Sequence, residues 1–137
     1  MPHDPALVAE TRAWLRKAAE DLRAADVERS ANPPVTSDMV FHAQQAAEKI
    51  LKGFLVWHRQ TFRKTHSLEE LGEQCLKIDA GLKTIIDKAV PLTEYAWKFR
   101  YPGEPDDPSS DEAEIAVAVA RELLDEVLSR LPHGVHP

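Results

Sequence analysis

The sequence contains few glycine, cysteine and aromatic residues. Its 137 residues contain five glycines, one cysteine and 7% aromatic residues. The single cysteine, Cys75, excludes an internal disulfide and a metal cluster of several thiolates within one chain. Cys75 lies in an apolar series, so we expect it to be a small core residue. Few glycines and few β-branched runs favour helices over strands.

Long apolar runs and the short motifs of well-known enzymes are also missing. No apolar stretch is long enough for a transmembrane helix, and no apolar signal segment lies near the N-terminus. We therefore expect a cytoplasmic protein that is neither exported nor membrane-spanning. No Walker loop, HExxH or GxSxG motif is present. We expect neither a metal nor a cofactor, because metal-binding bundles normally carry glutamate–histidine patterns that this sequence does not have.

The composition is that of one ordinary globular domain. Hydrophobic residues make up 43% of the chain and charged residues 29%, with a net charge of −6. This acidic balance counts against broad non-specific binding to a phosphate backbone. One basic segment, residues 57–66, still offers a local site for an anion.

Apolar spacing and capping signals predict an all-α antiparallel bundle of five to six helices. Asp4 and Pro5 are a typical helix start, and consecutive prolines after Asn32 end that helix. Serine–glutamate capping boxes start two later helices at Ser67 and Ser109. We expect one domain over residues 3–131 and a frayed tail over 132–137. The predicted helices span about 5–30, 37–58, 67–78, 82–90 (with Pro91 kinking it or starting another helix) and 109–130.

The helix expected over 37–58 has two apolar flanks. Its main stripe includes Val40, Ile50 and Phe54, whereas Phe41 and Leu55 lie well off that stripe. A helix that is apolar on more than one side is central in its bundle or belongs to an interface between subunits. We therefore expect a homodimer.

The same helix carries polar residues beside its second flank. Gln44 and Glu48 lie next to this flank, and buried amides and carboxylates need partners, so we expect them to form a polar network with Asp21. A further stripe opposite the main apolar face is interpreted as solvent-exposed, in preference to a polar strip in a dimer groove. That stripe consists of His42, Gln45, Lys49 and Lys52.

Four segments in this order resemble the HEPN domain family. They are Trp14 with Asp21-Leu22, Gln44–Lys49 with Lys52, Thr65–Leu68, and Arg100–Gly103. The resemblance implies a helical bundle, frequent dimerisation, and association with nucleotides or RNA. It also implies a minimal nucleotidyltransferase as a partner, since many prokaryotic members are encoded beside one and some such pairs are toxin–antitoxin systems.

The ribonucleases of that family use an arginine, a polar residue, and a histidine four to six residues after the arginine. Arg100 matches the arginine, but residues 101–107 contain no histidine. The loop also carries Glu104, Asp106 and Asp107, which would repel a phosphodiester. The favoured interpretation is thus a binding subunit, with a ribonuclease that uses His66 and Arg100, or an adaptor bundle without a ligand, as the alternatives. The candidate ligand-binding or polar-network residues are Asp21, Gln44, Glu48, Lys52, Arg100 and Tyr101.

Overall fold

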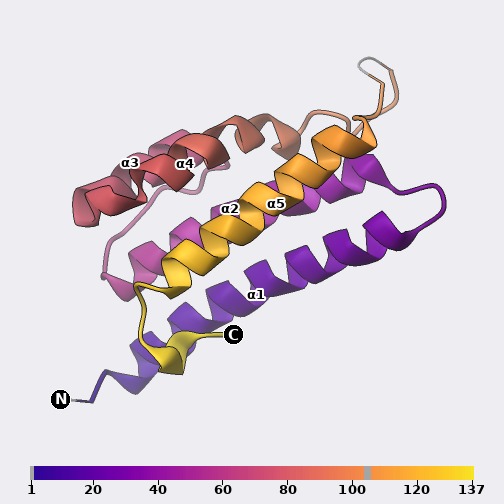
Figure 1. The fold of residues 1–137 in the computed structure, drawn as a ribbon. Helices are drawn as coiled ribbons and strands as arrows, with labels where there is room; N and C mark the ends of the chain where they lie inside the picture. The colour runs from indigo at the N-terminus through magenta and orange to yellow at the C-terminus, as the bar shows by residue number, and fades with distance from the viewer. Residues whose placement is uncertain (1, 104–105) are drawn as a thin grey trace.

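The computed structural model describes residues 2–103 and 106–137, and every regular element in these ranges is a helix (Figure 1). The predicted all-α fold is confirmed, with five α-helices. The helices are α1 (Pro5–Ser30), α2 (Thr36–Trp57), α3 (Leu68–Ile78), α4 (Lys83–Ala89) and α5 (Ser110–Leu128), with short 3₁₀ helices η1 (Ala80–Leu82), η2 (Val90–Ala96) and η3 (His133–Val135).

Side-chain caps mark the starts of three of the five described α-helices. The Asp4 carboxylate accepts a hydrogen bond from the backbone N–H of Ala6 at 2.9 Å, directly before the first turn of α1. Ser67 and Ser109 cap α3 and α5 in the same way, each through its hydroxyl oxygen. Each cap satisfies one of the N–H groups that a helix start leaves without a partner.

Helix α2 is the central element of the bundle. It packs against α1, α3, α5 and η2, and Figure 1 shows α1 on one side of it and the α3–α4 pair on the other. Both apolar flanks are used within one chain, because Leu55 is fully buried and Phe41 is half-buried. The small residues Ala43, Ala46 and Ala47 are also buried against neighbouring helices. The second flank therefore does not by itself require a second subunit.

The core is continuous across all five α-helices. Cys75 is fully buried in it, as predicted, and burial raises the pKa of its thiol to about 12. The thiol therefore stays protonated and unreactive at neutral pH. The largest fully buried side chains include Phe54, Leu15, Met39, Ile50, Leu51, Leu55, Leu68 and Leu71.

The C-terminal tail over 132–137 packs onto the bundle, which differs from the fraying expected from its sequence. Val135 is fully buried, and the Arg12 guanidinium of α1 donates to a backbone carbonyl of the tail. The His136 Nε2–H donates to the Leu128 carbonyl oxygen at 2.9 Å. The tail therefore stays in place because it satisfies carbonyls at the end of α5 and buries an apolar side chain.

Candidate functional site

Three polar side chains are buried together along one face of α2. Gln44, Glu48 and Lys52 follow one another at intervals of four residues, which aligns them on a helix. Glu48 is 6% exposed, Lys52 is 7% exposed and Gln44 is fully buried. The Lys52 ammonium donates to Glu48 Oε2 at 2.9 Å, and the Gln44 amide donates to Glu48 Oε1 at 3.4 Å. The sequence-based expectation of a polar network at Gln44 and Glu48 therefore agrees with the geometry.

The loop after α2 closes over this cluster through His66. The His66 Nδ1 lies 2.7 Å from Glu48 Oε1, and the Gln44 amide donates to the His66 carbonyl oxygen at 3.2 Å. A carboxylate only accepts hydrogen bonds, so Nδ1 carries the proton in this contact. The His66 side chain remains 63% exposed. It separates Glu48 from solvent and holds the loop on α2.

The environment of Glu48 keeps its side chain ionised. Burial alone would raise the pKa of the Glu48 carboxyl, but hydrogen bonds from His66 and Lys52 outweigh burial, and the pKa lies below its ordinary value. A carboxylate with such a pKa does not accept a proton at neutral pH. Its chemistry suits a structural ion pair rather than a general base.

Two aromatic rings enclose the Lys52 ammonium. Its Nζ lies 5.8 Å from the ring centroid of Trp14 on α1 and 5.7 Å from that of Phe62 in the loop after α2. Both distances are within the range of a cation–π interaction. The expectation of a solvated stripe is therefore wrong for Lys52, because partners from two other segments cover it.

Asp21 belongs to a different contact from the one predicted. Its Oδ2 lies 2.6 Å from the Lys49 ammonium, which links α1 to α2. A second link between the two helices joins His42 Nδ1 and Glu28 Oε1 at 2.8 Å. Asp21 thus neutralises Lys49 instead of joining Glu48.

The family marks at Asp21, Glu48 and Arg100 also predict that these three charges are linked to one another. Arg100 contacts neither Asp21 nor Glu48, so this prediction is wrong. Its Nη1 lies 3.3 Å from Asp38 Oδ1, and its guanidinium carbon lies 3.7 Å from the ring centroid of Phe41. Asp38 precedes Glu48 by ten residues on α2, which corresponds to about 15 Å along the helix axis. Arg100 therefore occupies one end of α2, away from the Glu48 cluster.

The residues after Arg100 point to solvent. Tyr101 is 82% exposed, and Asp106 and Asp107 are exposed as well. Glu104 lies outside the described residues. Tyr101 takes no part in the buried network.

The basic segment after α2 is a second surface feature. Arg59 lies 3.6 Å from Asp4, and Arg63 lies 2.9 Å from Glu70. Both arginines are largely exposed, and ion pairs of this kind contribute little to stability. Lys64 is exposed between them and His66. These side chains can therefore exchange their present partners for an anion at small cost.

Sequence reasoning missed two partners that the tertiary structure supplies. The first is Asp38, whose signal is its position in the first turn of α2 beside Phe41. The second is the His66–Glu48 contact, for which the sequence offers only that His66 directly precedes the cap residue Ser67. Neither signal by itself shows that Asp38 pairs with Arg100 or that His66 pairs with Glu48.

The described residues contain neither a metal-binding cluster nor a helix that could cross a membrane. Within residues 2–103 and 106–137, no three His, Cys, Asp or Glu side chains converge where they could hold a metal ion. No helix in this part of the chain combines the length and apolarity that crossing a membrane needs.

The fold and the site define an all-α bundle with a buried ion cluster under a basic loop and a separate arginine at one end of its central helix. A family model described as HEPN domain matches residues 11–131. The chain therefore belongs to the HEPN domain family, whose membership points to an RNA-related or nuclease-type function. No curated protein and no solved structure shows significant similarity to the chain.

Proposed function

We propose that this protein is a nucleotide- or RNA-binding subunit without the ribonuclease chemistry of its family. In this proposal it acts with a minimal nucleotidyltransferase as the second component of a toxin–antitoxin-type pair. The proposal depends first on Arg100, which matches the family's arginine but is not followed by the family's histidine. A guanidinium can hold a phosphate, but it cannot exchange a proton at neutral pH.

The surroundings of Arg100 support binding over cleavage. Its charge is partly balanced by Asp38, and Phe41 holds the guanidinium plane. Neither partner is a histidine, the residue that suits proton transfer at neutral pH. A phosphate that displaces Asp38 would therefore meet a fixed cation but no histidine.

The alternative of a ribonuclease that combines His66 with Arg100 has less support. His66 contacts Glu48, whereas Arg100 contacts Phe41, and these two positions of α2 are seven residues apart. Seven residues correspond to about 10 Å along the axis. This spacing along α2 argues against one scissile phosphate that contacts both groups in one chain.

The basic segment offers the second part of the proposed RNA contact. Arg59, Arg63 and Lys64 are exposed on the loop that His66 attaches to α2. Lys52 was also a candidate for ligand contact, but its burial against Glu48 assigns it to the folded core. The proposed RNA-binding residues are therefore Arg100 and the cations of the loop.

The proposed cleavage defect has a direct test. We expect purified protein to leave RNA intact, because the missing histidine removes a proton-transfer group that contributes about a hundredfold or more. The measurement compares RNA digestion by wild type with that by Arg100→Ala, both purified in parallel to remove contaminating nucleases. Cutting by wild type that Arg100→Ala abolishes would contradict the proposal, support the enzyme alternative, and make His66 the next residue to replace.

We also propose that the protein functions as a homodimer. Two of its exposed large apolar side chains, Trp97 and Tyr101, flank Arg100 in the sequence, and a second copy would cover them. Light scattering at tens of micromolar protein is expected to give the mass of two chains, and replacing Trp97 by serine should shift that mass toward one chain. A single-chain mass for wild type at this concentration would rule the dimer out.

A further inference from the structure

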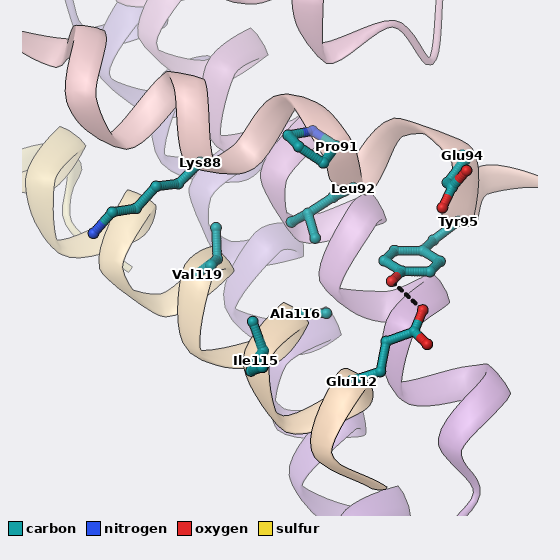
Figure 2. Close-up of a pocket in the computed structure, with 9 residues that line it drawn as sticks. All are labelled: Lys88, Pro91, Leu92, Glu94, Tyr95, Glu112, Ile115, Ala116 and Val119. Atoms are coloured by element: carbon teal, nitrogen blue, oxygen red, sulfur yellow. Dashed lines mark hydrogen bonds between the residues drawn. The ribbon is translucent and has the colours of Figure 1, made fainter. Parts of the chain in front are cut away.

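An open pocket lies between η2 and α5 (Figure 2). Its volume is about 420 Å³, within the range of small-molecule sites. Helix α4 ends just before Pro91, and the chain continues as the 3₁₀ helix η2. Ala116 of α5 contributes only a methyl group to the space between η2 and α5. The pocket therefore arises where an irregular helix crosses a small residue.

Most of the pocket surface is apolar. Pro91 and Leu92 form one wall, and Ile115 and Val119 of α5 form the other (Figure 2). Ile115 is 65% exposed, although a side chain of this size is more often buried. A bound apolar group would remove this surface from water.

Tyr95 and the two glutamates of the pocket lie at one end, and Lys88 lies at the other (Figure 2). The Tyr95 hydroxyl donates to Glu112 Oε2 at 2.5 Å (Figure 2). Burial and the neighbouring Glu112 raise the pKa of Tyr95, so its hydroxyl remains a donor at neutral pH. In a complete capping box at Ser109, the Glu112 carboxylate would accept a hydrogen bond from the backbone N–H of Ser109. Here the Glu112 carboxylate accepts a hydrogen bond from the Tyr95 hydroxyl instead.

Glu112 is the charged group of the pocket that is left without a counterion. Within the described ranges no lysine, arginine or histidine lies within ion-pair distance of its carboxylate, and its second oxygen accepts no hydrogen bond there. The other charged lining residues are paired, Glu94 with Lys98 at 3.2 Å and Lys88 with Glu122 at 3.4 Å. The pocket thus presents one carboxylate without an ion-pair partner beside an apolar wall.

We propose that this pocket binds a small organic cation, an amine carried on an aromatic or branched aliphatic body. The apolar body would lie between Leu92 and Val119, and the ammonium would donate to the second oxygen of Glu112. This inference is independent of the proposed function, because RNA is an anion and Arg100 and the basic loop lie on other elements. A charge-assisted hydrogen bond in a partly desolvated site provides both affinity and selectivity for the cation.

Three probes with the same ring test the proposal by NMR titration of the methyl signals of Leu92, Ile115 and Val119. The probes are 2-phenylethylamine, neutral 2-phenylethanol and anionic 3-phenylpropionate. We expect the amine to shift these signals and to bind about tenfold more tightly than the anion. Equal affinity for amine and anion, or shifts outside the pocket, would overturn the proposal.

Glu112→Gln separates charge from shape, because glutamine retains an acceptor for the Tyr95 hydroxyl. It is expected to weaken amine binding about tenfold while changing the affinity for 2-phenylethanol by less than about twofold. The matched control is Glu114→Gln, two residues along α5, where the carboxylate faces Arg29 instead of the pocket. An equal loss of amine affinity in both variants, or no loss in Glu112→Gln, would overturn the proposal.

Discussion

Replacing Glu48 by alanine is expected to lower the free energy of unfolding by about 3–5 kcal/mol, because it leaves a buried ammonium without its counterion. Lys52 is 7% exposed and cannot turn to water without leaving Trp14 and Phe62. The variant also releases His66 and with it the loop after α2. Urea denaturation followed by circular dichroism measures the loss.

A matched control uses an ion pair with the same spacing on the surface. Lys83 and Asp87 are also four residues apart, with side chains 69% and 57% exposed. Asp87→Ala is expected to change the free energy of unfolding by less than about 0.5 kcal/mol. Replacing Glu48 and Lys52 together by Leu and Met should recover most of the loss, since no charge then remains buried. A loss below about 1 kcal/mol for Glu48→Ala would mean that water reaches Lys52.

The pH dependence of the Glu48 contribution has a defined sign. The pKa of Glu48 is lower in the folded protein than its ordinary value of 4.5, so the folded state binds fewer protons than the unfolded state in this range. The stabilisation is therefore present above the ordinary pKa and is lost as the pH falls through the lowered one. The stability difference between wild type and Glu48→Gln should accordingly be largest near neutral pH and decrease in acid.

Binding to single-stranded RNA is expected to weaken about 20- to 50-fold between about 50 and 200 mM salt, as three to four phosphate contacts predict. The contacts are those proposed for Arg59, Arg63, Lys64 and Arg100. Because the whole chain carries a net charge of −6, affinity for RNA requires that these cations gather on one surface. Fluorescence anisotropy with a labelled oligonucleotide measures both the affinity and its salt dependence.

Two triple variants with the same net charge separate a local site from a general charge effect. Replacing Arg59, Arg63 and Lys64 by alanine should abolish measurable RNA binding and the salt dependence with it. Replacing three exposed lysines elsewhere should change the affinity by less than about threefold. Equal losses in the two variants, or binding insensitive to salt, would contradict the proposed surface. The control lysines are Lys17, Lys83 and Lys88.

Much of the fold could be predicted because helix boundaries depend on neighbours in sequence. Asp4 caps α1 and Ser67 caps α3 through bonds to residues two and three positions away. The central position of α2 could be predicted for a related reason. A helix that is apolar at Leu55 as well as along its main stripe must bury more than one side.

The candidate site was less predictable, because its contacts join residues distant in sequence. The helical periodicity of α2 places Lys52 opposite the main apolar face, and only the approach of Trp14 and Phe62 makes that position an interior one. Arg100 pairs with Asp38, 62 residues earlier, and not with the acids that the sequence favoured. Periodicity describes one helix and says nothing about which segment covers its other face.

The sequence by itself determined the class of fold, the helix order, and the absence of a histidine after Arg100, since all three are properties of residues close together in the chain. Only the tertiary structure decided that Glu48 binds both Lys52 and His66, and that Glu112 faces a pocket instead of completing its cap. The physical reason is the same in both cases. A charged side chain takes the partner that packing places within hydrogen-bond distance, and packing depends on the whole chain.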